Sequence, residues 1–287
     1  MKGRTIPIEE TMGFGHWARS DFARRRQVLR ETVSAFEQAV PVDHYQRLAK
    51  SNVERWRLER TGEQRQGPVV RVIAGDWGQV TQSLTREFGV VFAALNMANA
   101  YVPGGAYVEG APAQEENMFR RTDCHFSVDE TEMDPASERY YPHVSSMLNG
   151  ESGRVLLDTT CPRVCIRGPE DRERKDLGYQ WLPDDEVFPF YELRAAAMDL
   201  RSGMPFDPDQ ARGRISAQLE TLVAANIRHA VLSAFGCGAF RNPAPDVAQI
   251  YRQEVAARQE AFDCVAFAIF HPGYGPDNFT PFHIAFK

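Results

Sequence analysis

Apolar and amphipathic stretches alternate along this chain in a regular order. Short apolar runs are typical of strands covered on both faces of a sheet, and longer stretches with one apolar stripe predict helices. Strands are predicted at residues 69–73, 90–95, 230–234 and 264–270. Helices are predicted at residues 77–87, 209–226 and 245–261. This strand–helix order predicts an α/β fold with a largely parallel sheet and helices on both of its faces.

The N-terminal part of the chain has a helical pattern only. An amphipathic helix is predicted at residues 18–40, where Pro41 stops it. A shorter helix is predicted near residues 45–58. We therefore expect one domain over residues 1–287, with a helical N-terminal extension at 1–68 and a ligand-binding core at 69–287.

The middle of the chain is less regular. Residues 127–152 are acidic and without a clear period, and they predict a long surface excursion. Residues 168–186 predict a loop or insertion, since they combine many charges with glycine and proline. Short strands are predicted at 155–157, 164–167 and 187–193. Because Pro189 cannot donate a ladder hydrogen bond, the last of these is expected at the edge of the sheet.

Composition and charge narrow the function classes. A net charge of −6 argues against a nonspecific nucleic-acid binder. No apolar run is long enough to span a bilayer, and the first residues lack the apolar core of a signal peptide. We expect a cytoplasmic protein without a membrane or direct nucleic-acid partner.

The cysteines predict neither a disulfide framework nor a metal site. There are five of them, an odd number scattered over a long chain. Cys161 and Cys165 form a C-x3-C pair, but a zinc site needs four convergent ligands at tighter spacing. Reduced and mostly buried thiols are the expectation.

Two glycine-containing loops each follow a predicted buried strand. They are Pro103-Gly104-Gly105-Ala106 and Gly236-Cys237-Gly238. Glycines let the backbone turn sharply and approach a ligand, and turned backbone amides favour anions. Each loop alone could be an ordinary turn. Because ligands of such sheets bind beyond the carboxyl ends of the strands, the two loops could meet over one phosphate-bearing ligand.

Two adjacent carboxylates follow the first loop. Glu115 and Glu116 stand at the predicted start of a helix, in a stretch whose alanines, proline, methionine and phenylalanine suggest partial burial. Successive helical side chains diverge by about 100°, so one acid could hold hydroxyls while the other transfers a proton. Like-charge repulsion between the acids and from a diphosphate would raise a pKa, which a general acid near neutral pH requires.

The combined motifs resemble the signature of bacterial-type poly(ADP-ribose) glycohydrolases, which are macrodomain-fold enzymes. The segments that carry the resemblance are Asn96-x-Ala98-Asn99-Ala100, Pro103-Gly104-Gly105, Gly110-Ala-x-Ala-Gln114-Glu115-Glu116 with Arg120-Arg121, and the later Ser233-Ala-Phe-Gly-Cys-Gly-Ala-Phe240-x-Asn242-Pro243. The similarity runs from about residue 70 to the C-terminus. It implies a three-layer α/β/α fold with a mixed, mostly parallel central sheet behind the N-terminal helical extension.

The resemblance also implies roles for individual residues. Glu116 would be the catalytic acid in hydrolysis of an O-glycosidic ADP-ribose bond, and Glu115, helped by Asn99, would hold the ribose hydroxyls. The implied ADP-ribose-binding residues are Asn99, Gly104, Gly105, Ala106, Gln114, Gly236, Cys237, Gly238, Ala239 and Phe240, with Phe279 as an adenine neighbour. No metal or redox cofactor is needed. The implied partners are ADP-ribose or poly(ADP-ribose) and an ADP-ribosylated protein.

Two departures from the family pattern leave alternatives open. The third glycine of the first loop is replaced by Ala106, which would be strained if that residue needs a positive φ. Asp123 adds a carboxylate seven residues after Glu116, and it could cap a helix or contact a cationic leaving group. The alternatives are therefore an ADP-ribosyl-arginine hydrolase acting on mono-ADP-ribosylated protein, a module that binds ADP-ribose without cleaving it, and a related hydrolase of a small nucleotide-ribose metabolite.

Overall fold

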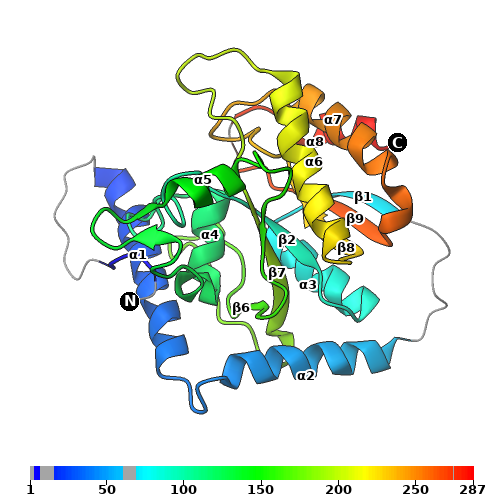
Figure 1. The fold of residues 1–287 in the computed structure, drawn as a ribbon. Coiled ribbons are helices and arrows are strands. Elements are labelled where there is room, and N and C mark those ends of the chain that lie inside the picture. Colours follow the sequence, from blue (N-terminus) through cyan, green and yellow to red (C-terminus); the bar gives the residue numbers. More distant parts are fainter. Residues whose placement is uncertain (1–2, 7–15, 61–68, 274) are drawn as a thin grey trace.

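A mixed, mostly parallel sheet forms the centre of the molecule (Figure 1). The computed structural model describes residues 3–6, 16–60, 69–273 and 275–287. In spatial order the sheet contains β1 (Val69–Ala74), β9 (Cys264–Ile269), β8 (His229–Leu232), β2 (Ala93–Met97), β7 (Phe188–Ala195) and β5 (Leu156–Leu157). The pairs from β1 to β7 are parallel, whereas β5 and β6 (Arg163–Cys165) run antiparallel to β7. The predicted fold class is confirmed.

Strand β9 shows why the sheet carries helices on both faces. Its side chains alternate between two apolar clusters: Val265, Phe267 and Ile269 belong to one, and Cys264, Ala266 and Ala268 to the other. All six side chains are buried. A strand that is apolar at every position has to be covered on both faces.

Three helices cover the first face. They are α6 (Pro208–Ala224), α7 (Ala244–Ala256) and α8 (Phe279–Ala285), which Figure 1 shows grouped together. Asp207 caps α6 by accepting hydrogen bonds from the amides of Asp209 and Gln210, which explains the start of this helix. The predictions at 209–226 and 245–261 are confirmed within the usual uncertainty of helix ends.

The opposite face is covered by helices from the first half of the chain. They are α1 (His16–Glu37), α2 (His44–Glu59), α3 (Trp77–Phe88) and α4 (Gln114–Arg121). Helix α1 packs against α4, and α2 packs against α3 and β7. The predicted extension therefore lies on the core, although parts of it fall outside the described residues, and its boundary at residue 69 stays a prediction.

The prediction for residues 127–152 is wrong. This segment contains β3 (Met133–Asp134), β4 (Arg139–Tyr140) and α5 (Pro142–Leu148), and it is packed rather than a surface excursion. Its buried apolar side chains form one cluster with residues that follow β2 and β7: Ala98, Ala100, Val128, Met133, Tyr140, Val144, Leu148 and Ala196. Acidic neighbours in the sequence hide these apolar positions, which become a core only through contacts with distant segments.

Strand β7 corrects a second prediction. Residues 188–190 pair with β6, and among the described residues no strand lies on their opposite side. Pro189 is tolerated there because its missing amide hydrogen is not needed for a strand ladder. Residues 191–195 lie between β2 and the antiparallel β5. The strand is therefore internal over its second half, and only its start behaves as an edge.

Three short 3-10 helices complete the secondary structure. They are η1 (Asp123–Phe126), η2 (Asp184–Glu186) and η3 (Gln259–Ala261). All five cysteines are free, and only Cys161 is exposed. Within the described ranges, no helix combines the length and the apolar character needed to cross a bilayer.

Candidate active site

A cavity of about 630 Å³ opens at the carboxyl ends of the parallel strands. Its lining includes the residues that follow β1, β2, β8 and β9. Both predicted loops contribute to it, through Ala106 on one side and Gly236 to Phe240, without Cys237, on the other. The expectation that the two loops meet at one cavity is confirmed.

Gln114 attaches the start of α4 to the end of β2. Its Nε2 donates to the carbonyl of Leu95 at 2.8 Å, and its Oε1 accepts from the amide of Met97 at 2.9 Å. The side chain lines the cavity, but both of its polar ends are occupied by β2 backbone. Gln114 therefore places the first turn of α4, and with it the two acids, at the cavity.

Glu115 lies under the loop after β2. Its Oε2 accepts from the amide of Asn99 at 2.7 Å, and the residue is 3 % exposed. Among the described residues its Oε1 has no hydrogen-bond partner. Burial, and then the charge of Glu116, raise the pKa of Glu115 well above its ordinary value.

The side chain of Asn99 shapes the same loop. Its Oδ1 accepts from the amides of Tyr101 and Val102 at 2.8 and 2.9 Å, which closes a turn. The residue also lines the cavity. Its backbone, rather than its side-chain oxygen, contacts Glu115.

Glu116 contacts the glycine loop directly. Its Oε1 accepts from the amide of Ala106 at 3.0 Å, and the residue is 8 % exposed. Burial raises the pKa of Glu116, and the hydrogen bond from Ala106 is the first of the contacts that oppose this rise. A buried carboxyl group with a raised pKa suits proton donation near neutral pH.

The first loop needs glycine at two positions and accepts alanine at the third. Gly104 and Gly105 have φ values of +69° and +57°. A Cβ on Gly105 would lie 2.5 Å from Oε1 of Glu116. Ala106 does not have a positive φ, so its methyl group introduces no backbone strain.

The second loop is held by Asn242. Its Nδ2 donates to the carbonyls of Met198 and Gly236 at 2.7 and 3.1 Å. Gly236 has a φ of +74°, and a Cβ there would lie 2.5 Å from that same Nδ2. Gly238, Ala239 and Phe240 are left at the cavity wall.

Comparison with known proteins agrees with this site. Residues 24–150 match the family model described as "Microbial-type PARG, catalytic domain". The resemblance to bacterial-type poly(ADP-ribose) glycohydrolases is therefore confirmed. The match includes both acids and the first loop, and it begins within α1, well before residue 70.

Solved glycohydrolase structures have the same fold. The poly(ADP-ribose) glycohydrolase of Thermomonospora curvata aligns with a TM-score of 0.63 and 20% identity, over 92% of this chain and 100% of that chain. Its complex with the inhibitor ADP-HPD aligns with a TM-score of 0.58 and 21% identity, over 92% and 98%. The enzyme of Deinococcus radiodurans in complex with ADP-ribose aligns with a TM-score of 0.54 and 25% identity, over 83% and 90%. No curated protein matches the chain.

Four residues implied by the glycohydrolase resemblance do not line the cavity, namely Gly104, Gly105, Cys237 and Phe279. The amide of Cys237 donates to the carbonyl of Ala234 at 3.0 Å, and its thiol is buried, so it cannot supply this amide to a diphosphate. Phe279 stacks on His283 with ring centroids 5.5 Å apart and packs against the core. Among the described residues of the C-terminal segment, the aromatic side chain that lines the cavity is that of Phe270, which is 47 % exposed.

The structure does not place Asp123 at the cavity. Helix α4 ends at Arg121, so the helical spacing from Glu116 does not persist. The carboxylate of Asp123 accepts from the amide of Val164 at 2.8 Å and from Nε2 of Gln46 at 3.3 Å. The expected contact with a leaving group is therefore not supported, because Asp123 connects η1 to β6 and α2 instead.

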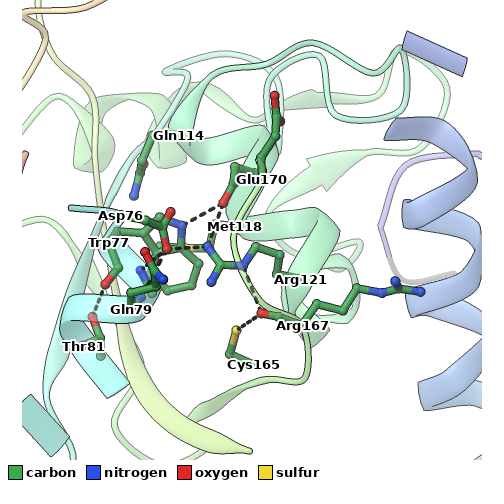
Figure 2. A network of polar contacts seen from close by, with 12 residues as sticks. Asp76, Trp77, Gln79, Thr81, Gln114, Met118, Arg121, Cys165, Arg167 and Glu170 are labelled. Atoms are coloured by element: carbon green, nitrogen blue, oxygen red, sulfur yellow. Dashed lines mark hydrogen bonds and ion pairs between the residues drawn. The ribbon is translucent and has the colours of Figure 1, made fainter. Parts of the chain in front are cut away.

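Sequence reasoning gave no role to Asp76 and Arg121. Asp76 lines the cavity, and its Oδ1 accepts from Nη1 of Arg121 at 2.7 Å and from the amides of Gly78 and Gln79, which caps α3. Figure 2 shows Arg121 between this carboxylate and the carbonyl of Arg167, to which its Nε donates at 3.1 Å. The sequence does contain a signal for Asp76. This residue stands shortly after a predicted strand and directly before a predicted helix, and aspartate is a preferred N-cap residue.

Arg201 is a second residue that the sequence did not reveal. It lines the cavity with its guanidinium 5.0 Å from the ring centroid of Phe240. The hydrogen bond to Asp199 is the largest cause of the raised pKa of Arg201, and the negative charge of Glu116 adds to this rise. The guanidinium of Arg201 therefore lies within electrostatic reach of the predicted acid, although two hydrogen bonds also pair it with the carboxylate of Asp199.

Proposed function

We propose that this chain is an ADP-ribosyl glycohydrolase that removes ADP-ribose from poly(ADP-ribose) or from ADP-ribosylated protein, with Glu116 as the general acid. The observation that carries the proposal is the acid pair itself. Glu115 and Glu116 are both buried and both have a raised pKa. Each also accepts a hydrogen bond from a backbone amide of the loop after β2. The matched family supports the reaction class, because its members are glycosidases of ADP-ribose bonds.

The two acids divide the work in this mechanism. Glu116, whose pKa is raised by burial, gives its proton to the leaving oxygen as positive charge develops at the ribose C1. Glu115 lines the cavity beside Glu116, where a carboxyl oxygen can accept hydrogen bonds from ribose hydroxyls. The bond between C1 and the leaving oxygen breaks, water attacks C1, and the proton that this water loses goes to the Glu116 carboxylate, which restores the acid.

The rest of the cavity fits the remainder of ADP-ribose. Gly238 and Ala239 are exposed at its wall, where their backbone can approach a diphosphate. Phe240 and the exposed ring of Phe270 offer flat apolar surfaces to a ribose and a base. No step of this mechanism draws on a metal ion or redox cofactor.

The guanidinium of Arg201, which is paired with the carboxylate of Asp199, is the charge near Glu116 that favours an anionic leaving group. Arg201 places a guanidinium at the cavity, while Asp123, the acid that could have held an arginine leaving group, lies elsewhere. Poly(ADP-ribose) carries a diphosphate in the unit that leaves, which a nearby cation stabilises. We therefore rank the polymer above arginine-linked mono(ADP-ribose) as substrate.

A Glu116→Gln variant tests the proposal. Glutamine keeps the oxygen that accepts from Ala106 but cannot donate a carboxyl proton, so we expect at least about a hundredfold loss of kcat with little change in ADP-ribose affinity. Wild type and variant are incubated with poly(ADP-ribose) and with proteins ADP-ribosylated on arginine, serine and glutamate. Equal rates for both on every substrate would remove Glu116 from the acid role. Tight ADP-ribose binding by calorimetry, with no release from any linkage, would identify a binding module instead.

A further inference from the structure

Residues 3–6 lie against the glycine loop, about a hundred positions away in sequence. The amide of Gly3 donates to the carbonyl of Val128 at 2.9 Å, and the amide of Arg4 donates to the hydroxyl of Tyr107 at 3.1 Å. The amide of Thr5 donates to Oε1 of Glu138 at 2.8 Å. Three consecutive amides thus fix this short segment beside the loop that carries Gly104 and Gly105.

The guanidinium of Arg4 is held in one orientation by two carboxylates. Its Nη2 donates to Oε1 of Glu109 at 2.8 Å, and its Nε donates to Oε2 of Glu138 at 3.0 Å. The side chain is 10% exposed. Its third contact is a 2.6 Å hydrogen bond from Nη1 to the carbonyl oxygen of Gly105.

That carbonyl belongs to the same peptide group as the amide of Ala106. This amide is the donor to Oε1 of Glu116. We propose that Arg4 is a positioning residue for Glu116 and acts through the Gly105–Ala106 peptide. This inference rests on the proposed function of Glu116 as the acid.

The physical basis is polarisation of one peptide group from both ends. A cation at the carbonyl oxygen increases the positive charge on the amide hydrogen, so the hydrogen bond to Glu116 becomes stronger and more directional. The same cation fixes the plane of a peptide that follows two residues with positive φ. Arg4 therefore sets both the place and the proton affinity of the acid.

Other charged groups also face Glu116. Glu115 and Arg120 lie on its own helix, Glu109 on the glycine loop, and Arg201 after β7. The amide of Ala106 is the first of the contacts that lower the pKa of Glu116, ahead of the charge of Arg120. The peptide on which Arg4 acts is thus the main specific influence on this carboxyl group.

Arg4→Gln and Arg4→Lys test the inference, with Arg26→Gln as the matched control. Arg26 donates from Nη1 to the carbonyl of Glu109 at 3.3 Å, so it bonds to the same loop but not to the peptide that contacts Glu116. The pH dependence of kcat and KM on poly(ADP-ribose) is measured for each protein, at a temperature where circular dichroism shows it folded. The midpoint of the alkaline limb does not depend on the folded fraction, so it separates positioning from a general loss of structure.

For Arg4→Gln we expect kcat to fall about tenfold while KM changes little. The alkaline limb should move upward by about half a pH unit, because the ionised form of Glu116 loses part of its stabilisation. Arg4→Lys should restore most of the pH profile, and Arg26→Gln should match wild type. An active wild type with an unshifted limb in Arg4→Gln would overturn the role of Arg4 alone. A wild type that releases no ADP-ribose would overturn the proposed function as well.

Discussion

An alanine at position 105 would probe how closely the glycine loop must approach the acid pair. The added Cβ would lie 2.5 Å from Oε1 of Glu116 and 3.1 Å from Oε2 of Glu115. The φ of residue 105 is +57°, which an L side chain rarely adopts. The substitution therefore perturbs both acids and the backbone, although it adds only one methyl group.

The magnitude follows from the contact distance. Ordinary contact begins at 3.4 Å, so the loop and Oε1 of Glu116 must separate by 3.4 − 2.5 = 0.9 Å. A displacement of about 1 Å at a reacting group can reduce the rate about a hundredfold. The positive φ adds about 1–2 kcal/mol of destabilisation, which corresponds to a fall of a few degrees in Tm for a chain of this size.

Gly153→Ala is the matched control. Gly153 also has a positive φ, of +75°, but it does not line the cavity and a Cβ there meets nothing within 4 Å. We expect Gly105→Ala to lose about a hundredfold in kcat/KM on poly(ADP-ribose), and Gly153→Ala to keep wild-type activity. Each protein is assayed for ADP-ribose release and, by thermal denaturation, for Tm. Near-wild-type activity of Gly105→Ala, at an unchanged Tm, would refute the close contact between loop and acid.

Two further substitutions test the charges around the site. Burial raises the pKa of Asp123 from 3.8 to about 6, so its contribution to stability is present below 3.8 and is lost as the pH rises through 6. Asp123→Asn does not ionise and should gain up to about 3 kcal/mol of unfolding free energy relative to wild type between about pH 4 and 7, followed by denaturant titration. It should also keep wild-type rates on every linkage, and a selective loss on arginine-linked substrate would restore Asp123 to the site. Arg201→Gln should reduce kcat/KM on poly(ADP-ribose) about fivefold to tenfold and spare arginine-linked substrate, and an equal loss on both would contradict the preference for an anionic leaving group.

The strands and helices of the core could be predicted because local and tertiary signals agree there. Residues 264–269 are apolar at every position, and their side chains alternate between the apolar clusters on the two faces of the sheet. Segment 127–152 shows where such agreement fails. Its strands are two residues long and its helix seven, too short for a period to emerge. Its apolar positions are buried by contact with residues that follow β2 and β7.

The acid pair and the first glycine loop were predictable because both lie within the connection that follows β2. The assignments that failed depended on where a local element ends. Asp123 was expected near Glu116 because the helix was assumed to continue, but α4 ends at Arg121. Cys237 was expected to donate its amide to a diphosphate, but this amide already donates to the carbonyl of Ala234 in a turn. Neither fact is visible in residue spacing, since a helix end and a turn hydrogen bond are both set by the segments packed around them.

The raised pKa values of the two acids depend even less on the order of the residues in the sequence. Burial is the first cause of the raised pKa in both Glu115 and Glu116, and burial is a property of the folded cavity. The first of the groups that oppose it are the backbone amides of Asn99 and Ala106, which every residue type except proline could supply. Arg4, which contacts the peptide next to Glu116, is separated from Gly105 by 101 positions. The reacting groups can therefore be identified from the sequence. The pKa of the acid depends instead on backbone amides and distant charges that come together only in the folded protein.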